Sequence, residues 1–344
     1  MTPLWHTEFS APVSNVSGTP ASDGKRLYTL LDGVVAFDAV TGDRLWSNPL
    51  PYLRSRPRNL SVRNGRVFGA GGVAFALDAV SGRELWRYSL PIPDTASAGL
   101  GRAAADESSF YVGTDTHEVY ALDQATGALL WRTDIGPGWK YRGIVTGITT
   151  AGDTIFVSAR EFSAANGYVS AGWIIGLDRA TGQTLWSFRN GSGTDWRTVS
   201  AGVHVTGRLL LASDHLNGSV FAVDRGTARE VWRRVGPRDK FGALTRPVVV
   251  NGRAIYASID NYMYALDPAT GAVRWQTQNE GSNLSVAVCG TRVFANYMDL
   301  AILDSDSGSV RLKVRTGEIF SDFAVAAGRV FAVSDRGIYA FSCR

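Results

Sequence analysis

The chain alternates between short apolar runs and glycine-containing turns along its whole length. In the stretch that follows residue 240, apolar runs at 244–250, 254–258, 263–266 and 273–277 each have the length and composition of one strand. Asn251-Gly252 separates the first two runs and favours a tight hairpin. The pattern predicts a unit of four antiparallel strands with short connections.

One phrase marks the passage from the third to the fourth strand of each unit. A clear copy runs from Ala121-Leu122-Asp123 through Thr126-Gly127 to Leu130-Trp131, and further copies follow about every 37 to 55 residues. The Asp and Thr side chains can hold the amides of a turn, and Gly accepts its left-handed position. A period in the forties with strand-like contents is typical of propeller blades. We expect seven tryptophans to lie on outer strands and to wedge between neighbouring blades: Trp5, Trp46, Trp86, Trp131, Trp186, Trp232 and Trp275.

The two ends of the chain supply the parts of one further unit. Runs at 320–326, 329–333 and 338–341 predict three strands without a fourth, and residues 3–7 predict a fourth strand with no unit before it. Joining the ends would remove two exposed sheet edges. We therefore expect a single all-β domain over residues 1–344, an eight-bladed β-propeller with four antiparallel strands per blade. About residues 318–344 together with 1–9 would form its last blade.

Repeats of this form, as at 121–131 and 265–275, resemble the tryptophan-docking repeats of pyrroloquinoline quinone (PQQ) dehydrogenases and their non-enzymatic relatives. Those relatives include the propeller lipoprotein of the outer-membrane β-barrel assembly machinery and sensor domains of some bacterial Ser/Thr kinases. The enzymes of the family hold their quinone against two adjacent, disulfide-bonded cysteines, with a calcium or lanthanide ion beside it. No two cysteines are adjacent in this chain, and 344 residues in eight units leave little room for the family's long insertions. The resemblance implies the scaffold, with no cofactor expected.

The two cysteines lie far apart in the sequence. Cys289 ends the predicted inner strand of the seventh unit, and Cys343 ends the predicted third strand of the eighth. They cannot make a zinc site on their own, because such sites need four ligands at short spacings. We expect their Cα atoms to lie beyond the ~7 Å limit for a disulfide, so both should be free thiols.

Other residues that could carry chemistry have ordinary explanations. Four histidines fall in different units without the spacing of a metal site, and the segment from Asp304 to Gly308, although it resembles a calcium loop, occupies the position of the repeated turn. We expect no catalytic and no metal-binding residues. The histidines, interpreted as strand or loop residues, are His6, His117, His204 and His215.

Net charge and hydropathy limit the classes of partner and the cellular compartments that the sequence allows. A net charge of +4 on 344 residues is mildly basic and falls short of a nucleic-acid footprint. No apolar run reaches the ~20 residues of a membrane helix, and the first residues lack the pattern of a signal peptide. The sequence alone leaves two locations open, the cytoplasm or a compartment reached with a leader that was then removed. The resemblance implies an extracytoplasmic location, in the periplasm or at the cell surface.

The residues that differ between units gather at one end of the predicted blades, where each inner strand begins. Cationic and aromatic side chains are frequent there, and Arg142 and Arg197 occupy equivalent positions on adjacent units. The longest insertion, residues 161–170, belongs to the same end. These side chains could be a solvated rim, or a basic, aromatic-rimmed funnel that binds anions through arginine forks and stacking. The candidate residues are Arg58, Arg102, Trp139, Lys140, Tyr141, Arg142, Trp196, Arg197 and Lys240.

We therefore expect a non-catalytic binding, scaffold or sensor propeller that recognises a partner protein or an anionic small molecule at this funnel. It would be a monomeric propeller within a larger assembly or a longer chain. The alternative is a PQQ-dependent oxidoreductase with a reduced cofactor site, which would bind PQQ with calcium.

Overall fold

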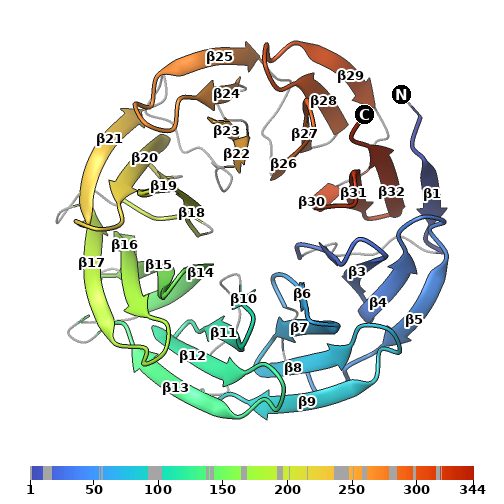
Figure 1. The fold of residues 1–344 in the computed structure, drawn as a ribbon, viewed down its shortest axis with the longest axis horizontal. Coiled ribbons are helices and arrows are strands. Elements are labelled where there is room, and N and C mark those ends of the chain that lie inside the picture. The colour runs from blue at the N-terminus through green and yellow to red at the C-terminus, as the bar shows by residue number, and fades with distance from the viewer. Residues whose placement is uncertain are drawn as a thin grey trace.

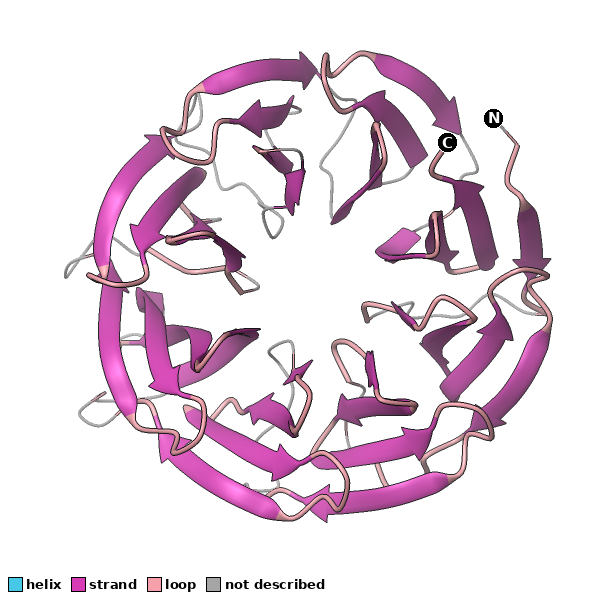
Figure 2. Ribbon diagram, in the orientation of Figure 1, coloured by secondary structure: helices cyan, strands magenta, loops and turns pink. Residues whose placement is uncertain are grey.

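The computed structural model describes residues 2–10, 18–53, 55, 57–91, 103–136, 139, 143–163, 169–191, 197–200, 202–214, 216–235, 248–250, 252–257, 262–278, 285–296, 300–314, 318 and 320–344. Every regular element among them is a strand, and the strands form eight four-stranded antiparallel sheets arranged as a ring (Figures 1 and 2). The predicted eight-bladed all-β propeller is confirmed. Among the described residues, none belongs to a helix that could span a membrane.

The blades follow one another in chain order, and each runs from an inner strand at the axis to an outer strand at the perimeter (Figure 1). Blades 1 to 4 consist of β2 (Ala21–Ser22), β3 (Arg26–Leu31), β4 (Gly33–Asp38) and β5 (Arg44–Asn48); β6 (Ser61–Arg63), β7 (Arg66–Ala70), β8 (Val73–Asp78) and β9 (Glu84–Ser89); β10 (Ala104–Ala105), β11 (Ser109–Gly113), β12 (Glu118–Asp123) and β13 (Leu129–Asp134); and β14 (Gly143–Ala151), β15 (Thr154–Phe162), β16 (Val169–Asp178) and β17 (Thr184–Asn190).

Blades 5 to 8 repeat this order, except that the outer strand of blade 8 is the first strand of the chain. They consist of β18 (His204–Thr206), β19 (Leu209–Asp214), β20 (Ser219–Asp224) and β21 (Arg229–Val235); β22 (Val248–Val250), β23 (Arg253–Ala257), β24 (Tyr262–Leu266) and β25 (Val273–Gln278); β26 (Ser285–Cys289), β27 (Arg292–Asn296), β28 (Leu300–Asp304) and β29 (Val310–Val314); and β30 (Phe320–Ala326), β31 (Arg329–Ser334), β32 (Gly337–Ser342) and β1 (Trp5–Glu8).

The ring closes where the sequence predicts. β1 pairs antiparallel with β32, and the register places Trp5 opposite Ala340 and Glu8 opposite Gly337. Blade 8 is thus built from both ends of the described chain, which Figure 1 draws in blue and dark red side by side. The pairing covers the edge of β32 that would otherwise be exposed.

The repeated Asp-x-x-Thr-Gly segment forms the turn between the third and fourth strands. In blade 3, Oδ1 of Asp123 accepts hydrogen bonds from the amides of Ala125 and Thr126 and from the Thr126 hydroxyl. Gly127 then takes a φ of 74°, which costs a glycine little. The Thr126 hydroxyl and the Thr126 amide hold the pKa of Asp123 below its usual range.

Six tryptophans make one recurrent contact between neighbouring blades, which we call the indole clasp. In blade 1, Nε1 of Trp46 donates to the carbonyl of Ala79 in blade 2, 3.2 Å away, and the ring covers Gly82 so closely that a Cβ there would lie 2.5 Å from it. The clasped carbonyl always belongs to the residue that follows the Asp of the turn. The six donors are Trp5, Trp46, Trp86, Trp131, Trp232 and Trp275.

Apolar side chains fill the spaces between the blades. Between blades 2 and 3, for example, Phe68 and Phe110 stack with ring centroids 5.2 Å apart, and both are fully buried. Trp86 packs against the same pair. The seventh tryptophan, Trp186, packs against Phe156 in the core between blades 4 and 5. All seven of these tryptophans lie on the outer strands of their blades.

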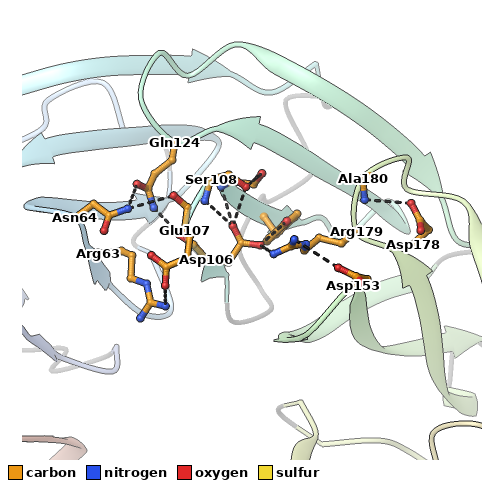
Figure 3. A network of polar contacts seen from close by, with 12 residues as sticks. Arg63, Asn64, Asp106, Glu107, Ser108, Gln124, Asp153, Asp178, Arg179 and Ala180 are labelled. Carbon is orange, nitrogen blue, oxygen red and sulfur yellow. Dashed lines mark hydrogen bonds and ion pairs between the residues drawn. The ribbon is translucent and has the colours of Figure 1, made fainter.

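The prediction of free thiols is wrong, because Cys289 and Cys343 form a disulfide with their Cα atoms 5.1 Å apart. Both strand assignments were right: Cys289 ends β26, the inner strand of blade 7, and Cys343 follows β32, the third strand of blade 8. These ends lie on the same face of adjacent blades, where the hairpin of one blade contacts the turn position of the next. Figure 3 shows the same region of the junction between blades 2 and 3, in which the hairpin residue Asn64 donates to Gln124 at 2.9 Å.

Candidate partner-binding site

The two faces of the propeller carry different connecting segments. Because the strands of a blade alternate in direction, the inner and third strands begin on one face, and the second and outer strands end there. This face, which we call the mouth face, receives the connections between blades and the loops between second and third strands. The opposite face, the turn face, carries the hairpins and the Asp-x-x-Thr-Gly turns.

Three of the nine predicted funnel residues lie in the described part of the chain, all of them beside the start of an inner strand on the mouth face. Arg58 is exposed, whereas Trp139 and Arg197 are partly buried. The structure thus places these three on one face but on different blades, and it does not test their convergence. The remaining six lie outside the described residues: Arg102, Lys140, Tyr141, Arg142, Trp196 and Lys240.

Trp139 packs into an aromatic cluster where blades 3 and 4 meet. Its ring lies 5.9 Å from that of Trp173 on β16 and 5.9 Å from that of His117, which it meets edge-on. It also lies flat on Gly143, where a Cβ would come within 2.1 Å of the indole. Nε1 of Trp173 in turn donates to Glu161, the first residue of the predicted insertion, at 3.1 Å. Trp139 therefore has a structural role, because its ring contacts stiffen the mouth face where blades 3 and 4 meet. Its side chain is also partly exposed on that face.

A row of four paired residues crosses blade 4 near its mouth-face end. Ile144 pairs with Arg160, Arg160 pairs with Gly172, and Gly172 pairs with Asn190. Paired residues project from the same side of a sheet, and this side packs against blade 5. Because Gly172 has no side chain, the backbone of blade 5 can approach it closely. A Cβ at this position would lie 2.4 Å from Val199 N.

On the blade 5 side of this contact, Asp214 is held in place by hydrogen bonds. Its fully buried carboxylate accepts hydrogen bonds from the Thr198 amide at 3.0 Å, the Thr198 hydroxyl at 3.1 Å and Asn190 Nδ2 at 3.3 Å. The Asn190 amide group also donates to the Thr198 carbonyl at 2.6 Å and accepts from Arg233 at 2.8 Å. This network fixes the segment that begins at Arg197, whose side-chain carbons lie over Gly191.

Arg160 lies in the same contact but outside this network. Its Nε has no access to solvent, and the guanidinium makes no hydrogen bond or ion pair with any residue that the structure describes. Burial lowers the pKa of Arg160 below its ordinary value, and the attraction of Asp214 acts in the opposite direction. A guanidinium stays protonated in proteins, so this is a positive charge with free donors.

An unused buried donor costs about 1–3 kcal/mol, and more when it is charged, so such groups in native proteins call for an explanation. A guanidinium fork matches the two oxygens of a carboxylate or phosphate, and a partly dehydrated site strengthens that contact. The arrangement can therefore hold an anionic group, and its rigid surroundings keep the site formed before the anion arrives.

Sequence reasoning missed Arg160 and Asp214. Each is a charged residue close to the end of a second strand that begins with apolar or small residues, and in blade 4 that strand is lengthened by the insertion. A charge that follows such a run was the available signal. What the sequence could not supply was the side of the sheet on which each charge projects.

The remaining candidates from the sequence keep structural roles where they are described. His117 Nδ1 lies 2.8 Å from Asp134, and the ring of His6 stacks on that of Tyr339 at 4.0 Å. Asp304 forms the turn of blade 7 through the amides of Asp306 and Ser307. His204 lies in β18, and His215 is outside the described residues.

The donor set does not fit PQQ held as in the dehydrogenases. The two cysteines are separated by 54 residues and join two blades, so no pair of adjacent cysteines is present to lie against a quinone. Within the described part of the chain, no three His, Cys, Asp or Glu side chains form a group that could hold a metal ion.

The chain is similar both to outer membrane protein assembly factors and to quinone-dependent enzymes. BamB from Burkholderia pseudomallei is 30% identical over 56% of this chain and 44% of its own length, and BamB from Shewanella oneidensis is 23% identical over 74% and 58%. The chain thus spans about half the length of the curated relatives that it matches. A quinohemoprotein alcohol dehydrogenase from Pseudomonas putida is 24% identical over 82% of this chain and 42% of its own length.

The crystal structure of BamB from Moraxella catarrhalis superposes with a TM-score of 0.71 and 19% identity, covering 98% of this chain and all of the other, which shows a shared fold. The model of the family described as outer membrane protein assembly factor BamB matches residues 2–94, 69–170 and 170–341. Because these matches cover nearly the whole chain, the protein belongs to this family of PQQ-like propellers.

Proposed function

We propose that this protein is a non-catalytic scaffold propeller that binds an acidic segment of a partner protein on its mouth face, over blades 4 and 5. The observation that carries the proposal is the partly buried guanidinium of Arg160, whose Nε has no access to solvent and which no described residue engages. Around it lie Arg197 and the lengthened strands β15 and β16. The assembly factors among the relatives support a binding role and an extracytoplasmic location, and the disulfide supports an oxidising compartment.

The residues outside the described part extend this proposal. Arg142, Trp196 and Tyr141 flank the same two blades in the sequence, and Arg58, Arg102, Lys140 and Lys240 would add positive charge on the other inner-strand starts. A summed positive field attracts an acidic segment and weakens with salt, whereas a cofactor site would be selective for one planar molecule.

A labelled acidic peptide tests the proposal directly. We expect the protein to bind a fluorescein-labelled hexa-aspartate in low salt by fluorescence anisotropy. Arg160→Gln should weaken binding about tenfold, and the double change Arg142→Ala with Arg197→Ala about a hundredfold or more, because each charged hydrogen bond contributes ~1.5–3 kcal/mol. The matched control is Arg208→Gln, which removes the same charge from the turn face, where Arg208 pairs with Asp224 at 3.1 Å.

Equal binding by all four proteins would contradict the proposal. The enzyme alternative is tested separately: the protein is mixed with PQQ and calcium, passed through a desalting column and assayed for dye reduction with alcohols or sugars. A retained chromophore with turnover would replace the scaffold proposal by the oxidoreductase.

A further inference from the structure

The junction between blades 7 and 8 lacks the indole clasp. Leu312 on β29 occupies the position that Trp275 has on β25, and Val314 occupies that of Thr277, which donates to the Gly308 carbonyl. Neither Leu312 nor Val314 has a side-chain donor. The two hydrogen bonds from outer-strand side chains that join blade 6 to blade 7 therefore have no counterpart from these positions.

Cys343 stands in blade 8 where the clasped residue stands in other blades. In blade 2 this is Ala79, whose amide donates to the carbonyl of the hairpin residue Gly65 at 2.9 Å. The Cys343 amide donates to the Gly328 carbonyl of its own hairpin at 3.0 Å, so the two residues are equivalent. At the position whose carbonyl accepts the tryptophan hydrogen bond in other blades, blade 8 has the disulfide-bonded residue Cys343.

Cys289 is the last residue of its inner strand, and it pairs with Arg292 across the hairpin. Its equivalent in blade 2 is Arg63, which pairs with Arg66 and forms an ion pair with Glu107 of blade 3. The next residue, Asn64, reaches the residue equivalent to Cys343, namely Gln124 (Figure 3). Neighbouring hairpin positions thus make polar contacts at one junction, whereas a covalent bond forms at the other. The approach is close at the latter, since a Cβ on Gly290 would lie 2.8 Å from the Cys343 carbonyl oxygen.

We propose that the Cys289–Cys343 disulfide replaces the indole clasp at this junction and makes closure of the ring dependent on oxidation. Blade 8 is the blade that closes the ring, and its third strand, β32, carries both Cys343 at its end and the pairing with β1 along its edge. Reduction frees the end of β32 from blade 7. The remaining ties there are noncovalent, such as the hydrogen bond from Arg292 to the Ser342 carbonyl at 3.1 Å.

The experiment compares oxidised protein, protein reduced with a phosphine under native conditions, and the double variant Cys289→Ser with Cys343→Ser. We expect the reduced protein and the variant to melt about 4–8 °C below the oxidised protein. Amide exchange should rise about tenfold or more in residues 5–8 and 320–342, while blades 2 to 5 change by less than about twofold. The matched control is Asn64→Ala with Gln124→Ala, which removes the hydrogen bond between the hairpin and the turn position at the junction of blades 2 and 3, where Trp86 still makes the indole clasp. It should lower the melting temperature by no more than about 2 °C.

Equal melting temperatures for the oxidised protein and both disulfide-free forms would overturn the proposal. So would a rise in exchange spread evenly over all blades, or two titratable thiols in unreduced protein. If the double variant fails to fold, the natively reduced wild-type protein still gives both readouts.

Discussion

A guanidinium removed from water normally finds a carboxylate or a set of carbonyl groups, because unpaired buried charge is expensive. The side chain of Arg160 has neither among the described residues, while Asp214 beside it is held by hydrogen bonds from Thr198 and Asn190. The two charged residues thus have different roles. Asp214 fixes the backbone of blade 5, whereas the hydrogen-bond donors of Arg160 are available to another molecule.

This division predicts opposite effects of two substitutions on stability. Arg160→Met should leave the free energy of unfolding unchanged or raise it by up to about 2 kcal/mol, because it removes a buried charge that makes no hydrogen bond and keeps the apolar stem. Asp214→Asn should lower it by about 2–4 kcal/mol, because the network loses its charged acceptor. Urea unfolding measures both. If Arg160→Met destabilised the protein by more than about 1 kcal/mol, the guanidinium would be part of the folding core.

At the scale of the element, the turn aspartates give blades 1 to 7 the same pH-sensitive feature. The amides of Thr41 and Val40 hold the pKa of Asp38 below its usual range, and the Ser81 hydroxyl and amide do the same for Asp78. A carboxyl group whose folded pKa is lowered contributes stability above its unfolded pKa of ~3.9 and loses it as the pH falls through the folded value.

Asp123→Asn isolates one such turn. Asparagine can still accept the amide hydrogen bonds but carries no charge, so the variant should be less stable than the wild type at pH 7 by about 1 kcal/mol or less, given the exposure of the turn. The gap should shrink towards zero near pH 3, where the wild-type carboxyl group is protonating. Urea midpoints at pH 7, 5, 4 and 3 give the comparison, and a gap that stays constant with pH would show that the charge is not involved.

These elements are also the part of the protein that the sequence predicts best. The turn at Asp123, the glycine at 127 and the tryptophan at 131 act through local hydrogen bonds and φ preferences, so each copy of the phrase specifies its own strand ends. The disulfide and the Arg160 contact depend on which residues of two blades meet across a junction. That information is spread over positions 54 residues apart, and no local pattern in the sequence connects them.

At the scale of the whole molecule, closure makes the ring a rigid frame for the mouth face. Trp5 on β1 clasps the Ala39 carbonyl of blade 1 while β1 pairs with β32 of blade 8, so this one strand joins the first and last blades. The disulfide ties the other side of blade 8 to blade 7. The closing blade is therefore secured on both sides.

Removal of residues 1–9 should open this frame. The deletion exposes the edge of β32 and leaves Gly42 without the indole that covers it, so we expect aggregation or a large fall in melting temperature. Trp5→Phe is the matched control, because it keeps the strand and an aromatic ring and loses the indole N–H bond, which contributes about 1 kcal/mol, together with part of the packing over Gly42. A deleted protein that eluted as a monomer and melted at the wild-type temperature would show that β1 is not needed for closure.

Site-specific photocrosslinking in cells that express the protein tests most directly whether the mouth face over blades 4 and 5 binds the partner through Arg160. A photoreactive phenylalanine is placed at Phe162 on the mouth face or, as the control, at the exposed Val80 on the turn face. The account predicts one discrete adduct from position 162, lost when Arg160 is changed to Gln and retained with Arg208→Gln, and no such adduct from position 80. An adduct from position 80 alone, or one from position 162 that is unchanged by Arg160→Gln, would contradict it.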